Sequence, residues 1–167
     1  MADDAPAGPG PHRETARPEW VDYNGHMNVA YYALVFDHGT DNVLEHLGLG
    51  RHYRDSTGRS VFVVESHVTY EAEVLVGDAV AVTSRVIGCD RKRLHLFHAM
   101  HREKDGRLAA TNELMFVHTD LRARRAVSFP DDAKARIETA IAAQSAAPPP
   151  SQAGRAIALA AGRPASG

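Results

Sequence analysis

The 167-residue chain has a single cysteine, a single tryptophan and no strong excess of either charge. One cysteine excludes a disulfide within the chain and a metal site built from several thiolates. We expect this residue, Cys89, to be a small apolar filler, because no base lies beside it in the sequence. The formal net charge of -2 is unlike the strongly basic footprint of a nucleic-acid-binding surface, so no nucleic-acid partner is expected.

Long apolar runs are also missing. No window approaches the ~18 apolar residues that span a bilayer. The acidic, proline-containing segment 1–6 lacks the basic start and apolar stretch of a signal peptide. We therefore expect no membrane partner and a cytoplasmic location. With 44% hydrophobic and 24% charged residues, the composition is that of an ordinary globular domain.

Glycine and proline are concentrated at the two ends of the chain. Segments of this composition have too few apolar side chains to bury enough surface for a stable folded structure. The sequence therefore predicts a flexible N-terminal tail over 1–11, one folded domain over 12–144 and a disordered Ala/Pro-rich tail over 145–167.

Hydrophobic spacing predicts one long helix and an antiparallel sheet. Apolar residues recur at helical spacing from Val29 to Leu47, with Asn28 suited to the N-cap and Gly48 to the position after the C-cap. A short helix is expected over 130–143. Period-two alternation predicts an early strand and four long ones that form a meander; these are expected near 15–21, 60–70, 80–86, 94–102 and 108–119.

In the first long strand, one face is expected to carry every second residue: Phe62, Val64, Ser66, Val68 and Tyr70. A sheet of this size buries the long helix only by wrapping around it. The expected class is thus α+β with a hot-dog fold. Because such a sheet leaves an edge uncovered, we expect a homodimer or a higher homo-oligomer.

The segment Asp22–Asn28 gathers polar side chains around a glycine directly before the long helix. A helix start offers free backbone N–H groups to a reacting carbonyl oxygen, and a nearby carboxylate can handle water. Gly25 permits close approach of a ligand to the backbone. The segment is therefore interpreted as an active-site loop.

The stretch 20–28, followed by Tyr31, Tyr32 and Phe36, resembles the start of acyl-CoA thioesterases of the 4-hydroxybenzoyl-CoA thioesterase type. Within that superfamily, segments 18–27 and 90–98 are similar to the betainyl-CoA thioesterase group, whose members occur alone or fused to carnitine dehydrogenase. The resemblance covers residues 13–125. It implies hydrolysis of an acyl-CoA, with betainyl-CoA favoured, and no metal or organic cofactor.

The resemblance implies that Asp22 is the catalytic carboxylate, either as nucleophile on the thioester carbonyl or as general base for water. The alternative is a simple turn residue. Asn24, His26 and Asn28 are similar to the Asn and His positions of plant acyl carrier protein thioesterases, which implies water positioning. Asn28 can equally be only the N-cap, and His26 can equally orient the loop.

Three further sets of residues are candidates. Glu65 lies in an apolar strand with His67 on the same face, as an acid–base pair or as solvent-facing side chains. The basic residues of one turn can bind the CoA phosphates or can simply be solvent-exposed; they are Arg91, Lys92 and Arg93. A cationic acyl group needs aromatic faces, and the candidates near the loop are Trp20, Tyr23 and Tyr31.

Two other functions remain open at this level: a hot-dog hydratase or dehydratase, and a non-catalytic acyl-CoA-binding protein. No metal site is expected. On a strand, His98 points away from His95 and His101, so these histidines cannot converge on one ion.

Overall fold

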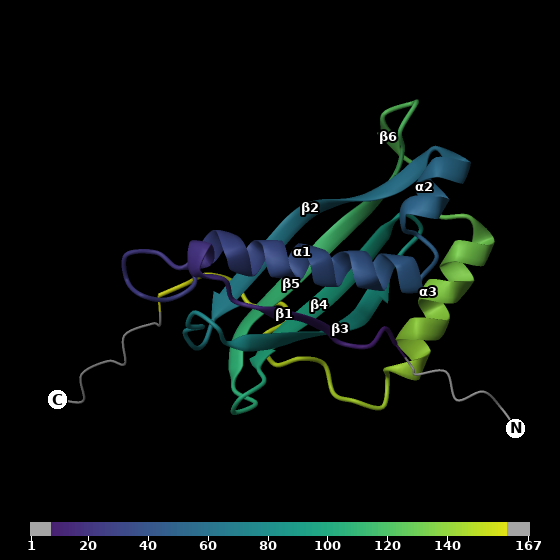
Figure 1. Cartoon of the computed structure of the whole chain (residues 1–167). Coiled ribbons are helices and arrows are strands. Elements are labelled where there is room, and N and C mark those ends of the chain that lie inside the picture. The colour runs from purple at the N-terminus through teal and green to yellow at the C-terminus, as the bar shows by residue number, and fades with distance from the viewer. Residues whose placement is uncertain (1–7, 160–167) are drawn as a thin grey trace, which may run out of the picture.

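A computed structural model describes residues 8–159 and shows a curved antiparallel sheet with the long helix α1 lying across its concave face (Figure 1). Within this range no helix is long and apolar enough to cross a membrane. The elements are, in chain order, β1 (His12–Thr15), a 3-10 turn (Pro18–Trp20), α1 (Val29–His46), α2 (Arg51–Thr57), β2 (Arg59–Tyr70), β3 (Ala79–Cys89), β4 (Arg93–Arg102), β5 (Leu108–Asp120), β6 (Arg125–Ala126) and α3 (Asp131–Ala143).

The long helix and both of its ends are as predicted. The Asn28 side chain accepts a hydrogen bond from the Ala30 N–H at 3.0 Å, which makes it the N-cap. At the other end Gly48 has a φ of 66°, the left-handed conformation that ends many helices. Helix α3 also lies where it was expected, and Pro130 serves as its N-cap.

The expected four-stranded meander is wrong in one connection. The order of the main strands is β1-β3-β4-β5-β2, and the two-residue β6 pairs with β5. Of the four long strands, only β3, β4 and β5 therefore follow one another as neighbours. Strand β2 pairs with β5 instead of β3, and its other edge has no partner strand within residues 8–159. The segment after β2 therefore crosses the sheet from one edge to the other, which is the topology of the hot-dog fold.

A β-bulge in β2 makes the predicted alternation of the strand faces wrong in the first half of the strand. The register moves by one residue between Val63 and Glu65. Before the bulge Val63 faces the helix with its partner Phe116, and after it Ser66 does so with Leu114. Phe62 thus lies on the outer face together with Glu65, opposite to the alternation that the sequence predicts.

The early strand begins sooner than predicted. Strand β1 ends at Thr15, because Pro18 starts the 3-10 turn instead of sitting inside a strand. The short helix α2 was not predicted, since its seven residues contribute too little periodicity to be recognised.

The core consists of two apolar clusters along α1, separated by a polar contact. Thr40 donates to the Phe36 carbonyl and accepts from Nε2 of His98 at 3.0 Å, while Nδ1 of His98 accepts from Ser84 at 2.7 Å. Because the Thr40 hydroxyl proton is directed to Phe36, Nε2 of His98 must carry a proton; in the neutral ring that burial favours, Nδ1 is then the acceptor. This polar contact ties α1, β3 and β4 together.

Neutral His98 makes stability depend on pH. Burial lowers the pKa of His98 from 6.5 to about 4. Between these values the unfolded chain binds a proton that the folded chain does not. The contribution of His98 to the free energy of unfolding is therefore fully present above pH 6.5. It decreases by roughly 3 kcal/mol as the pH drops towards 4. Urea unfolding and NMR of the His98 ring check this; a ring that titrates near pH 6.5 in the folded state contradicts it.

The C-terminal segment differs from the expected disordered tail. Residues 144–154 cross the outer face of the sheet, where Arg85 donates to the carbonyls of Pro148 and Ala147 at 2.6 and 3.0 Å. The Gly154 N–H donates to Glu113 at 2.7 Å. These bonds hold a segment whose composition alone predicts no structure. Residues 160–167 of the expected tail, and residues 1–7 of the N-terminal one, lie outside the described range.

Candidate active site

The loop Asp22–Asn28 is closed on itself before α1 begins. Val21 and Met27 form an isolated antiparallel bridge at its base. Across the loop the Asp22 N–H donates to the His26 carbonyl at 3.2 Å, and the Gly25 N–H donates to the Asp22 carbonyl at 3.0 Å. Gly25 has a φ of 84°, a conformation that side chains with a Cβ rarely adopt. Glycine is thus required for the turn itself.

The loop also orients the carboxylate of Asp22. Its Oδ1 accepts a hydrogen bond from the Asn24 N–H at 2.8 Å. The side chain is half-buried, whereas those of Tyr23 and Asn24 are exposed. The carboxylate is therefore held in one orientation at the protein surface, with Oδ2 outside this bond.

The backbone N–H groups expected to bind a carbonyl oxygen are mostly occupied. Within residues 25–28, internal acceptors take three of them: those of Gly25, Met27 and Asn28. In the described chain the N–H of His26 and, one residue further, that of Val29 at the start of α1 have no acceptor. The structure narrows the candidate donors to these two.

The connection between β2 and β3 packs against the loop and supports it. This contact was not predicted from the sequence. The Met27 N–H donates to the carbonyl of Val74 at 2.8 Å, in the connection between β2 and β3. Arg102 holds this connection through the Glu73 carbonyl at 2.9 Å, and the buried Asp78 accepts from the N–H of Leu75 at 3.0 Å. Only the three-dimensional fold brings these residues beneath the loop.

Asp78 is ionised in this support. Burial alone would raise its pKa, but the hydrogen bonds from Lys104 at 2.6 Å and from Leu75 outweigh this and lower the pKa below its usual value. Paired in this way, the carboxylate can be buried without the cost of an isolated charge.

The aromatic candidates separate into different environments. Trp20 was expected to be free to reach a ligand, but it is 4% exposed and belongs to the core below α1. Its ring stacks on Tyr31 at 5.3 Å, and the guanidinium of Arg17 lies over it at 5.1 Å. Tyr31 is partly exposed, and Tyr23 is 97% exposed. Of the three aromatic candidates, therefore, the two tyrosines offer exposed surface near the loop and Trp20 does not.

The other predicted site residues do not meet Asp22 within one chain. Glu65 and His67 lie on the outer face of β2, away from α1. The hairpin Arg91–Arg93 lies at the far end of β3 and β4, about 30 Å from the end that carries the loop. In that hairpin the Asp90 carboxylate pairs with Arg93 at 2.6 Å and caps the turn, which lowers the pKa of Asp90 to about 2.

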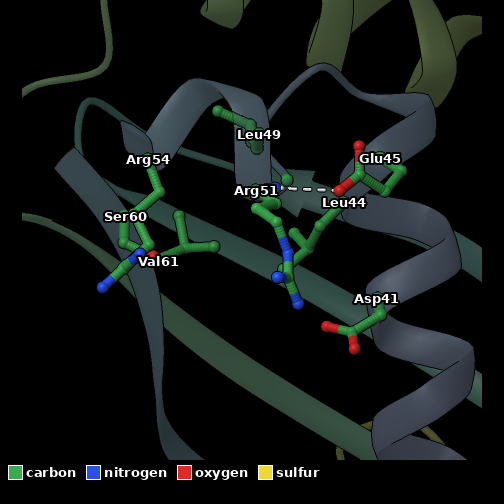
Figure 2. Close-up of a pocket in the computed structure, with 9 residues that line it drawn as sticks. Asp41, Leu44, Glu45, Leu49, Arg51, Arg54, Ser60 and Val61 are labelled. Atoms are coloured by element: carbon green, nitrogen blue, oxygen red, sulfur yellow. Dashed lines mark hydrogen bonds between the residues drawn. The ribbon is translucent and has the colours of Figure 1, made fainter. Parts of the chain in front are cut away.

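A pocket of about 470 Å³ lies at the other end of α1. Figure 2 shows Asp41 and Glu45 on α1, Arg51 and Arg54 on α2, and Ser60 at the start of β2 around it. Glu45 accepts from the Arg51 N–H at 2.8 Å and so fixes the start of α2. The pocket combines both signs of charge and was not predicted, because α2 was not.

Comparisons with known proteins agree with this fold. Residues 16–137 match the profile of the thioesterase-like superfamily. The chain is 42% identical over 142 residues to the betainyl-CoA thioesterase of Pseudomonas aeruginosa, a match that covers 85% of this chain and 89% of that protein. It is 41% identical over 146 residues to an L-carnitine dehydrogenase/betainyl-CoA thioesterase of Agrobacterium fabrum and spans 30% of that longer protein.

A solved structure of a related protein has the same fold. A Staphylococcus aureus protein in complex with CoA superposes with a TM-score of 0.82 at 34% identity, covering 89% of this chain and 94% of that one. The profile match over most of the folded chain, together with these relatives, shows that the chain is a hot-dog-fold member of the thioesterase-like superfamily, a family that hydrolyses thioesters.

Proposed function

We propose that this protein hydrolyses acyl-CoA thioesters with betainyl-CoA as its preferred substrate, giving glycine betaine and CoA. The observation that carries the proposal is the 42% identity to a betainyl-CoA thioesterase across nearly the whole folded chain. The CoA bound to the related S. aureus protein supports the choice of carrier. The expected lack of a metal or organic cofactor in catalysis, and the cytoplasmic location, stay predictions.

Asp22 is the proposed catalytic group. The Asn24 N–H holds Oδ1, so Oδ2 either attacks the carbonyl carbon or removes a proton from the attacking water. A single turnover in ¹⁸O-labelled water separates the two routes. An acyl anhydride on Asp22 that water opens at the aspartyl carbon leaves label in the Asp22 carboxylate. If water opens the anhydride at the acyl carbon, the label enters only the released acid, as in general-base catalysis, so mass spectrometry of the rapidly quenched enzyme for an acyl group on Asp22 completes the test.

The carbonyl oxygen is proposed to accept from the N–H groups of His26 and Val29. Both lie where the positive end of α1 stabilises developing negative charge. Asn28 supports this role as the N-cap. The His26 and Asn24 side chains remain candidates for positioning water.

Gly25→Ala is expected to lower kcat about 10- to 100-fold, because a Cβ disfavours the φ of 84° that shapes the loop. Gly154→Ala is the matched control. Gly154 has a φ of 74° in the C-terminal segment on the outer face of the sheet, and at both positions an added Cβ meets nothing within 4 Å. Both variants are expected to lose about 1–2 kcal/mol of stability, and only the first should lose activity. Equal activity of the two variants contradicts the role of the loop.

The subunit is proposed to form a homodimer through β2. This edge strand is 12 residues long and exposes Phe62, Val63 and Val64 by 46% to 60%. A long apolar edge with unpaired backbone groups favours pairing with a second copy of itself. Antiparallel pairing across a twofold axis near the middle of β2 joins the two sheets into one.

Such pairing would complete the site. Tyr70, at the end of β2, contacts Tyr32 near the catalytic end of α1, with ring centroids 5.2 Å apart. Ser60, at the start of β2, lines the pocket at the opposite end. The twofold axis brings the start of one β2 beside the end of the other. Such an axis would therefore bring the partner's pocket next to the Asp22 loop.

In the same proposed dimer, basic residues of the partner subunit could bind the phosphates of CoA. Arg51 and Arg54 of the partner's pocket would lie near the entrance for CoA, and the partner's Arg91–Arg93 hairpin at the same end of the joined sheet. Their guanidinium groups suit the CoA phosphates. Tyr23 and Tyr31 are proposed to face the trimethylammonium group of the acyl chain.

A screen of acyl-CoAs with a thiol reagent tests the proposed function. Release of free CoA from betainyl-CoA is expected at a higher kcat/KM than from acetyl-CoA or benzoyl-CoA. Binding of acyl-CoA without release of thiol would contradict hydrolysis, and so would addition of water to an unsaturated acyl chain.

A further inference from the structure

A cluster of two histidines and one glutamate lies between β1 and α1, outside the site described above. The Nε2 atom of His12 lies 2.7 Å from Oε1 of Glu14, and Nδ1 of His38 lies 2.5 Å from the same oxygen. The potential ligand atoms of the three side chains all lie within 4.8 Å of one another. Three potential donor atoms thus lie close together, although two come from β1 and the third from the middle of α1.

The donor set is one that transition-metal ions use. Imidazole nitrogens and a carboxylate oxygen bind Zn²⁺ at about 2.0–2.2 Å, which places neighbouring donors in a tetrahedral site about 3.3 Å apart. The side chains need only small rotations to reach this spacing. Hard ions such as Mg²⁺ prefer oxygen ligands and are not expected to bind here.

The backbone on both sides of the cluster is fixed independently of it. The Asn42 side chain of α1 donates to the Gly10 carbonyl at 2.8 Å, which ties the start of β1 to the helix. His12 is paired with Val82 in the sheet. At Gly39 the helix comes so close to β3 that an added Cβ would lie 3.0 Å from Val82. The two elements therefore keep their separation, and the ligands are largely preorganised.

The three side chains are partly exposed, so an ion can reach the cluster from solvent. The Glu14 side chain is 13% exposed, while those of His12 and His38 are 26% and 41% exposed. The carboxylate is shielded from water and the imidazole of His38 is open to it. An ion can thus enter from solvent, and water can take the remaining coordination position.

We propose that His12, Glu14 and His38 form a binding site for Zn²⁺ or a similar transition-metal ion that links β1 to α1. His38 lies ten positions after Asn28 on α1, about 15 Å along the helix from the catalytic loop. The ion is therefore structural and does not take part in hydrolysis. Sequence reasoning missed the cluster because its two parts lie on different elements, with the loop and half of α1 between them.

Zinc titration of the tag-free full-length chain, stripped with EDTA and monitored with a competing fluorescent indicator, tests the site. The parent is expected to bind one Zn²⁺ per chain. His38→Gln and Glu14→Gln are expected to weaken binding at least about tenfold. His95→Gln is the matched control, because His95 contacts Glu113 at 2.8 Å and residues 8–159 offer no third ligand there. This variant should bind as the parent does.

Thermal unfolding gives a second readout. At Zn²⁺ 100-fold above the Kd of the parent, the midpoint of the parent is expected to rise by about 5–10 °C, with at most about half of that rise for His38→Gln and no rise with Mg²⁺. Circular dichroism establishes that each variant is folded, and His12→Gln replaces any variant that is not. A parent that binds no zinc, or variants that bind it as tightly as the parent, would overturn the proposal.

Discussion

Asp22→Asn is expected to lower kcat for acyl-CoA hydrolysis by about 10²- to 10⁴-fold with little change in the fold. The amide oxygen of asparagine can still accept the hydrogen bond from the Asn24 N–H, so the loop keeps its shape. What is lost is the charged oxygen that serves as nucleophile or base. Thiol release under saturating substrate measures the effect, and circular dichroism verifies the fold.

Asp37→Asn is the control for this variant. Asp37 is an exposed carboxylate on α1, outside the loop Asp22–Asn28. Its substitution changes the net charge equally and should leave kcat unchanged. If Asp22→Asn hydrolysed the thioester as fast as the parent, the mechanism would be wrong whatever the substrate.

Val64→Glu is expected to convert the proposed dimer to a folded monomer with less than about one hundredth of the parent activity. Val64 is 60% exposed in the subunit, so the change costs the isolated chain little. In the proposed dimer the new carboxylates of the two copies would lie close to the twofold axis and repel each other. The monomer would also lack the pocket that the partner supplies.

Sedimentation velocity at micromolar protein and the thiol assay measure the two effects together. Leu159→Glu is the control, because Leu159 is 98% exposed and lies far from β2 in the chain. It should change neither the association state nor the activity. A Val64→Glu variant that remains dimeric would contradict pairing through β2, and a fully active monomer would contradict a site completed by the partner.

Local signals explain what could be predicted from the sequence. Helix α1 carries its apolar stripe, its N-cap at Asn28 and its glycine at position 48 within about twenty consecutive residues. The turn at Gly25 and the carboxylate of Asp22 likewise lie in one short segment. Such features depend on neighbours in sequence, so the helix and both of its ends were predicted correctly, while the catalytic role of Asp22 stays a prediction.

Non-local contacts explain the rest. The bulge in β2 moves Phe62 to the outer face, and only its pairing with β5 makes the bulge visible. Trp20 was taken for a ligand-facing residue, but the core below α1 buries it. The segment after α3 has the composition of a disordered tail, and Arg85 holds it against the sheet.

The most direct test of the proposed function compares two substrates that differ in charge and hardly in shape. Betainyl-CoA carries a trimethylammonium group, and 3,3-dimethylbutanoyl-CoA carries a neutral tert-butyl group in its place. Recognition of the cation by aromatic faces predicts a kcat/KM at least about tenfold higher for betainyl-CoA. An equal or higher kcat/KM for the neutral analogue would contradict a site built for a cationic acyl group.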